Sequence, residues 1–72
     1  MNYDYGDEVL FRAADNAGNA VAKPGAIVGI TAVNSEEQVR IHGYPLGTIL
    51  YSVEFSDGSD ALVPEGMIEP LT

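Results

Sequence analysis

The segment from Tyr51 to Leu71, YSVEFSDGSDALVPEGMIEPL, restricts the possible folds of this chain more than any other stretch. Over 48–55, one parity holds Ile49, Tyr51, Val53 and Phe55 and the other holds Thr48, Leu50, Ser52 and Glu54, the period of two that a barrel strand requires. Asp57-Gly58 follows, and both residue types tolerate the positive φ of a hairpin turn. The pattern predicts a β-hairpin whose second strand covers 60–63, with Ala61 and Val63 facing inward.

The end of the chain reads as a corner and a closing strand. Pro64 lacks the N–H that a strand ladder needs, so we expect a single 3-10 turn over 64–66. The apolar residues of 67–71 then form a last strand, and Pro70 restricts it to the edge of a sheet.

The first half of the chain predicts strands joined by longer connections. Val9 and Phe11 share one parity and predict a strand over 7–12, followed by a long Ala-, Asn- and Gly-rich loop over 13–24. Pro24-Gly25 marks a turn before a β-branched strand over 26–33. We further expect a polar turn over 34–37, a weak strand over 38–42 and a loop over 43–47 with Tyr44 at its tip.

Three leucines do not fit the simple alternation of inward and outward residues. Leu10, Leu50 and Leu62 all fall on the outward parity of their strands. Either strong coiling buries them under the long loop, or they form an exposed patch that a partner covers. The sequence leaves both alternatives open.

Length and composition define one small domain. A chain of 72 residues forms a single domain, 1–72. It has no cysteine, which excludes disulfides and thiolate sites and favours a reducing cytoplasm. The longest apolar run, 26–33, is too short to span a bilayer, and the N-terminus lacks the pattern of a signal peptide. We therefore expect a cytoplasmic protein without a membrane partner.

Eleven acidic residues against three basic ones give a formal charge of −8. Such a field repels nucleic-acid phosphates and attracts a basic protein, although acidity can also serve solubility alone. No catalytic constellation is visible: His42 is the only histidine and has no nucleophile near it in sequence. Asp57 to Asp60 lacks the further ligands of a calcium loop, and no glycine pattern predicts a phosphate site. We expect no enzyme activity, no metal and no cofactor.

The candidate binding residues are therefore acidic or aromatic side chains in turns and at strand ends. Phe11, Tyr51 and Phe55 have the phase of core residues, whereas other tyrosines lie in terminal or loop segments. The residues that we expect to contact a protein partner are Tyr3, Asp4, Tyr5, Asp7, Tyr44, Glu54, Asp57 and Asp60. Tyr3 and Tyr5 have an alternative role, which is to pack the N-terminal arm across the end of the domain.

Taken together, the elements predict an all-β fold: a small SH3-like barrel of about five antiparallel strands. It would have a long loop after the first strand and a 3-10 turn before the last. The run Tyr51-x-Val53-x-Phe55-x-Asp57-Gly58 is similar to the tudor-like pattern within that class.

The whole chain resembles the immunity protein 31 family of bacterial polymorphic toxin systems. The resemblance is carried by Tyr3 to Asp7 with Val9, by Gly25 and Val28, by Gly47-Thr48 and Tyr51, by Val53 to Gly58, by Val63-Pro64-Glu65 and by Leu71. It implies a small cytoplasmic protein that binds and neutralises a cognate toxin. The matching positions are mostly structural, so no family binding residues are carried over.

The leading expectation is an immunity protein whose acidic surface occludes a basic toxin domain. A nuclease toxin needs a basic cleft for phosphates, which makes an acidic plug a sensible inhibitor. Two alternatives remain at this point: a peptide-binding or assembly module of the SH3 or tudor type, and an acidic DNA mimic that acts as an antirepressor.

Overall fold

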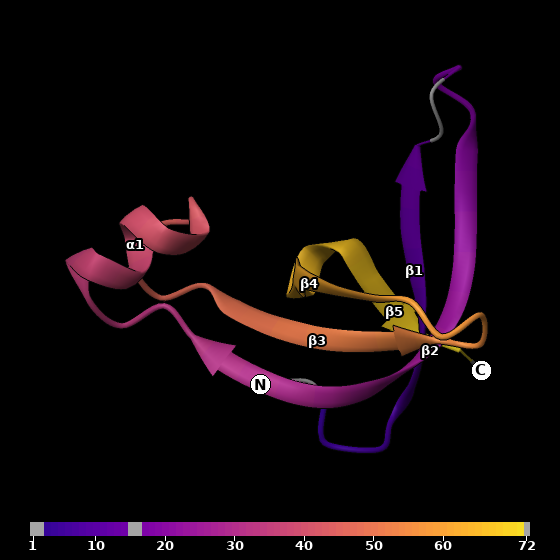
Figure 1. Ribbon diagram of the computed structural model, residues 1–72, viewed down its shortest axis with the longest axis horizontal. Coiled ribbons are helices and arrows are strands. Elements are labelled where there is room, and N and C mark those ends of the chain that lie inside the picture. The colour runs from indigo at the N-terminus through magenta and orange to yellow at the C-terminus, as the bar shows by residue number, and fades with distance from the viewer. Residues whose placement is uncertain (1–2, 15–16, 72) are drawn as a thin grey trace.

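The computed structural model describes residues 3–14 and 17–71, and these form one coiled antiparallel sheet with a short helical excursion (Figure 1). Five strands, one α-helix and a 3-10 turn follow one another in the order β1 (Glu8–Ala14), β2 (Ala20–Ala32), α1 (Glu36–His42), β3 (Ile49–Phe55), β4 (Asp60–Pro64), η1 (Glu65–Met67) and β5 (Ile68–Pro70). The strand order β4-β3-β2-β1-β5 places the last strand beside the first, as in an SH3-like barrel. The predicted all-β class is confirmed.

The predictions for 48–71 are confirmed almost residue for residue. The tight turn between β3 and β4 closes through the Phe55 N–H, which donates to the Ser59 carbonyl at 2.8 Å, and Gly58 has φ +87°. Val63 is buried and Ala61 packs against the core, as the alternation predicts. The 3-10 turn lies one residue later than expected, and β5 is an edge strand paired with β1 alone.

The predicted long loop over 13–24 is wrong, and so is the turn at Pro24-Gly25. β1 and β2 pair continuously from Glu8↔Ala26 to Ala14↔Ala20, so only 15–19 connect them. Pro24 is tolerated inside β2 because of the direction of its nitrogen. Ile27 donates to the Asp7 carbonyl, so by alternation Pro24 faces the other side, where β3 has already ended at the pair Gly25↔Phe55.

The predicted turn over 34–37 and strand over 38–42 are also wrong, because this segment contains the helix α1. Ser35 is its N-cap: the side-chain oxygen accepts from the Gln38 N–H at 3.2 Å. Glu36 and Glu37 lie in the first turn, where the helix dipole favours negative charge. Gly43 ends the helix at φ +78° and donates its N–H to the Val39 carbonyl at 2.8 Å. The Ser-x-x-Gln spacing of a capping box was the signal for this helix.

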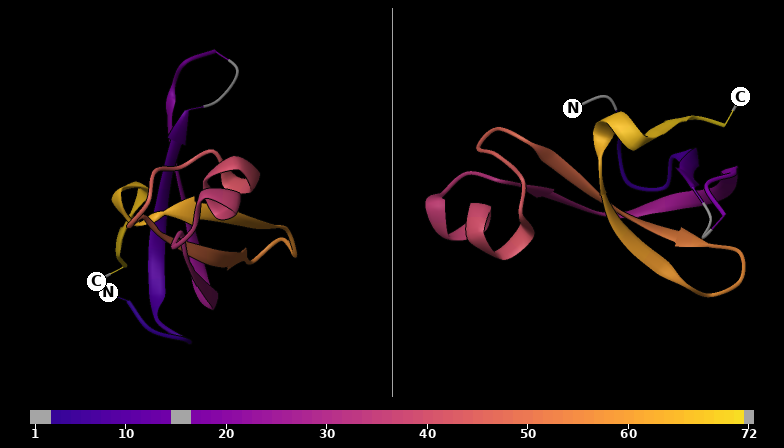
Figure 2. Two further views of the ribbon diagram at one scale, coloured as in Figure 1. Left: turned by 90° about the vertical axis from the view of Figure 1, so that its left-hand side faces the viewer. Right: turned by 90° about the horizontal axis from the view of Figure 1, so that it is seen from above.

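We expect Ser35→Ala to destabilise α1 locally by about 1 kcal/mol while the barrel stays folded. The reason is that α1 stands away from the sheet (Figure 2) and contributes no buried residue. Amide hydrogen exchange should show faster exchange over 38–43 only, with the exchange of β3 amides unchanged. An equal acceleration in β3 would mean that helix and barrel unfold as one unit.

The core lies inside the coiled sheet. Its buried members are Val9, Ile27, Tyr51, Val53, Phe55, Val63 and Ile68. Tyr51 and Phe55 therefore have the core role that their phase predicts, and Phe11 packs against this cluster with its ring 5.7 Å from that of Phe55. None of the helices among residues 3–14 and 17–71 is long and apolar enough to cross a membrane.

The three outward-parity leucines have three different environments, so neither alternative holds for all of them. Leu50 is fully buried although it is not part of the main core cluster, Leu10 is half-buried, and Leu62 is 39% exposed on the edge strand β4. The long loop that was expected to cover them does not exist.

Candidate protein-docking face

The predicted contact residues fall in three separate parts of the structure. Glu54 and Asp60 lie opposite each other on β3 and β4, and Asp57 lies in the turn that joins these strands. A second group, from Tyr3 to Asp7, forms the arm that precedes β1. Tyr44 is half-buried in the 43–47 connection after α1, toward the other end of the sheet from the β3–β4 turn (Figure 1).

The N-terminal arm packs against the barrel through Tyr3. Its ring packs edge-on against Tyr51, with centroids 5.4 Å apart and an interplanar angle of 88°. Its hydroxyl donates to the Ile68 carbonyl at 3.2 Å. Partial burial, aided by the charges of Glu65 and Glu69, raises the pKa of Tyr3 above its ordinary value. The alternative role of packing across the domain end is thus confirmed for Tyr3, whereas Tyr5 is 64% exposed.

Asp4 and Asp7 build the turn between this arm and β1. The Asp4 N–H donates to Oδ2 of Asp7 at 2.8 Å, and the Asp7 N–H donates to the Asp4 carbonyl at 3.1 Å. The Gly6 N–H then donates to the Ile27 carbonyl at 2.8 Å and ties the turn to β2. Both carboxylates remain exposed, and their contact with a partner remains a prediction.

Asp57 is engaged within its own turn. Its Oδ1 accepts from the Ser59 N–H at 2.9 Å and from the Ser59 hydroxyl, and its Oδ2 lies 3.6 Å from Nζ of Lys23. The Ser59 hydrogen bonds, with a smaller contribution from Lys23, hold the pKa of Asp57 below its ordinary value. The same Lys23 ammonium lies 4.3 Å from the centroid of the Phe55 ring. Asp57 therefore organises the turn, which makes it a weaker candidate than its neighbours for contact with a partner.

The lowered pKa of Asp57 predicts a loss of stability in acid. A carboxyl whose pKa is lower in the folded state stabilises the fold above its unfolded pKa, about 3.9, and that contribution disappears as the pH falls below it. Asp57→Asn should therefore lose less stability than the wild type between pH 6 and about pH 3. Urea unfolding at the two pH values measures this, and an equal loss in both proteins would contradict it.

Three other carboxylates form a row across the sheet that has no internal partner. The register pairs Glu8 with Ala26, Ala26 with Glu54, and Glu54 with Asp60, so these four residues lie side by side on four adjacent strands. We call them the acidic row. Registered residues point to the same face of a sheet, and all three carboxylates are exposed. Within the described part of the chain, none of the three makes an ion pair or a side-chain hydrogen bond.

This arrangement costs stability. Adjacent strands lie about 4.8 Å apart, so Glu54 and Asp60 carry like charges at direct cross-strand positions. Such a pair is unfavourable by about 0.2–1 kcal/mol. The two ion pairs among the described residues, Arg12 with Glu69 at 2.6 Å and Lys23 with Asp57, leave the row untouched. The row is therefore an uncompensated negative strip on the outer face.

An open hollow of about 310 Å³ lies along this strip, with both Glu8 and Glu54 in its lining. Its lining is apolar apart from three residues and consists of Glu8, Pro24, Gly25, Ala26, Glu54, Phe55, Ser56 and Leu71. Ala26 has a small side chain, and the register places Glu8 on one side of it and Glu54 on the other. A long aliphatic side chain with a cationic head, that of arginine or lysine, matches this combination of apolar lining and flanking carboxylates.

Glu8 was not predicted as a contact residue. Period-two alternation places it on the polar side of its strand, but its distance from Glu54 depends on the register of β2. That register was hidden by the mistaken turn at Pro24-Gly25. The alternation of the two strands does reveal the shared face. Val9 and Phe55 face the core, so their neighbours Glu8 and Glu54 both face outward.

The aromatic residues do not form the cage that a tudor-like reader would need. Both ring pairs among the described residues, Tyr3 with Tyr51 and Phe11 with Phe55, pack in or against the core. The described residues also contain no group of three histidine, aspartate or glutamate side chains placed to hold a metal ion.

Comparisons of the chain with protein-family models, with curated proteins and with solved structures find no match. The likeness to the immunity protein 31 family therefore rests on the residues quoted above alone.

Proposed function

We propose that this protein is an immunity protein, which binds a basic toxin domain and neutralises it by covering it with the acidic row. The observation that supports the proposal is the row itself: three exposed carboxylates in register, without partners among the described residues, two of which line an apolar hollow. Folding alone favours separating or pairing such charges. A partner that brings cations to the row would supply the missing compensation.

The proposed mechanism has a steering step and a docking step. The formal charge of −8 attracts a basic surface over long range and speeds encounter. On contact, an arginine or lysine of the partner would place its stem in the hollow beside Ala26 and its cationic head between Glu8 and Glu54. A toxin that acts on a phosphate-containing substrate holds the phosphates with such cations. Once those cations contact the acidic row, the cleft of the toxin could not bind its substrate.

Affinity capture from the native host tests this function. The wild type, the row variant Glu54→Gln/Asp60→Asn and the turn variant Asp57→Asn serve as bait, with captured proteins identified by mass spectrometry. We expect a basic protein that the wild type and the turn variant retain and the row variant loses. Expression of that protein alone should arrest growth, and co-expression of the wild type should restore it.

Two outcomes would contradict the proposal. Recovery of only a transcriptional regulator would favour the antirepressor alternative, in which the acidic face mimics DNA. Retention of the same partner by the row variant at unchanged affinity would mean that another surface carries the binding.

A further inference from the structure

The connection between β2 and β3 is a hydrogen-bonded projection from the sheet. It leaves the sheet after Val33 and returns at Thr48, and its base is closed by two hydrogen bonds. The Val33 N–H donates to the Thr48 carbonyl at 2.9 Å, and the Gly47 N–H donates to the Val33 carbonyl at 2.8 Å. Caps at Ser35 and Gly43 hold α1 within it. We call residues 34–48 the α1 excursion.

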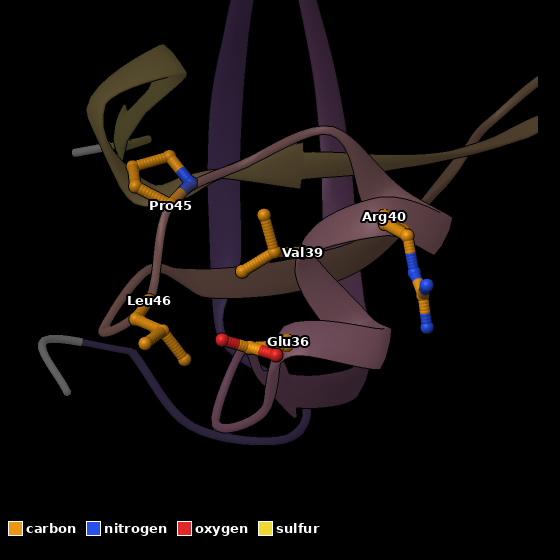
Figure 3. A pocket seen from close by; sticks show the side chains of 5 residues that line it. All are labelled: Glu36, Val39, Arg40, Pro45 and Leu46. Atoms are coloured by element: carbon orange, nitrogen blue, oxygen red, sulfur yellow. The ribbon is translucent and has the colours of Figure 1, made fainter.

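This ordered projection gives almost nothing to the core. No residue of α1 is buried, and the core cluster contains no residue of the excursion. Instead the excursion exposes apolar surface: Leu46 is 60% exposed beside an open hollow of about 510 Å³. Figure 3 shows Val39 between Glu36 and Arg40 of α1 on one side and Pro45 and Leu46 of the loop on the other. A seven-residue helix is not stable in isolation. The caps of α1 and the hydrogen bonds at the base of the excursion therefore maintain this outward-facing surface.

The excursion has a low net charge. It contains two carboxylates, Glu36 and Glu37, and one guanidinium, Arg40, so the whole excursion contributes −1 to the formal total of −8. Arg12 and Lys23 are engaged in ion pairs, so Arg40 is the basic side chain without an ion pair in the described part of the chain. With so small a net charge, the excursions of two copies can approach each other with little mutual repulsion.

We propose that the α1 excursion is a homodimer contact, in which a second copy docks through the same surface about a two-fold axis. In such a contact residue i meets j and j meets i. The excursion has the required self-complementarity: Leu46 projects beside a hollow that can receive the Leu46 of the second copy. Glu36 and Arg40 at the margins of that hollow would form two reciprocal ion pairs across the axis. This proposal is independent of the acidic row.

Sedimentation equilibrium over a wide concentration range provides the first test. A contact this small belongs to the weak class below about 1,200 Å² of total buried area, so concentrations up to about 1 mM are needed. The mass of the wild type should rise from 7.6 kDa toward twice that value. Leu46→Asp should remain monomeric at the highest concentration, while the control Leu62→Asp, at an exposed leucine of β4, should associate like the wild type.

Charge complementation provides the second test and does not depend on the stability of any one variant. Arg40→Glu places carboxylates against carboxylates across the axis, and Glu36→Arg places guanidinium groups against guanidinium groups. Each variant alone should dimerise at least tenfold more weakly than the wild type. An equimolar mixture should form a heterodimer, because each carboxylate of one variant then meets a guanidinium of the other.

Circular dichroism and amide spectra of each variant confirm that the excursion remains folded. A wild type that is monomeric at about 1 mM overturns the proposal. So does a wild-type dimer that Leu46→Asp leaves intact, or a mixture of the two charge variants that stays monomeric.

Discussion

The double substitution Glu54→Gln/Asp60→Asn is expected to stabilise the fold and to weaken partner binding at the same time. Removal of the like-charge pair should raise the free energy of unfolding by about 0.5 kcal/mol. The association rate with a basic partner should fall by at least about tenfold at low salt, because long-range steering and the contact at the row are both weakened. Urea unfolding measures the first effect, and stopped-flow or surface-based kinetics with the captured partner measures the second.

Two comparisons separate this prediction from a general effect of net charge. Glu36→Gln/Glu37→Gln removes an equal number of charges from α1, away from the row. It should slow association by less than about threefold. Glu8→Gln alone should also weaken binding, although Glu8 has no acidic neighbour in direct register. Equal slowing by the α1 variant would show that net charge, and not the row, governs association.

Gly25→Ala is expected to destabilise the barrel by about 1–3 kcal/mol, a large share of the stability of a small domain. A Cβ at this position would lie 2.5 Å from Cγ1 of Val53 and 2.9 Å from the carbonyl oxygen of Glu54. The second contact is with backbone, so side-chain rotation alone cannot relieve it. β2 and β3 would have to separate at the pair Gly25↔Phe55, next to the acidic row.

Gly66→Ala is the matched control for this prediction. A Cβ at Gly66 would meet nothing within 4 Å, and its φ is not positive. We expect its free energy of unfolding to stay within about 0.5 kcal/mol of the wild type or to rise slightly. Equal effects of the two alanines in urea unfolding would contradict the close packing of β2 on β3.

The elements that could be predicted from sequence are those whose local signals agree with their tertiary role. Apart from the buried Leu50, β3 alternates, Asp57-Gly58 suits its turn, and Pro64 ends β4, so 48–71 needed no knowledge of the rest of the chain. The β1–β2 hairpin could not be predicted this way. Its small residues have weak strand preference, and continuous pairing between the two strands outweighs that preference.

The helix was missed for a different reason. Val39 and Ile41 alternate over a segment too short to distinguish period two from period 3.6. The decisive signals were at its ends, where Ser35 and Gly43 supply the caps. A prediction based on these two caps, and not on the alternation of Val39 and Ile41, gives the helix α1.

For the candidate site, residue type could be predicted but position could not. Glu54 and Asp60 were expected from the hairpin, and the structure adds Glu8 through the register of β2. Tyr3 and Asp57 carry the chemistry of contact residues, yet both are engaged in internal contacts. The contacts in the folded structure, and not the residue type, distinguish an unpartnered carboxylate such as Glu54 from Asp57, which holds a turn.

The salt dependence of association with the captured partner tests the central claim most directly. Between about 50 and about 500 mM salt, the association rate of the wild type should fall by at least about tenfold, and that of Glu54→Gln/Asp60→Asn by much less. A wild-type rate and affinity that stay constant across this range would contradict an acidic docking face.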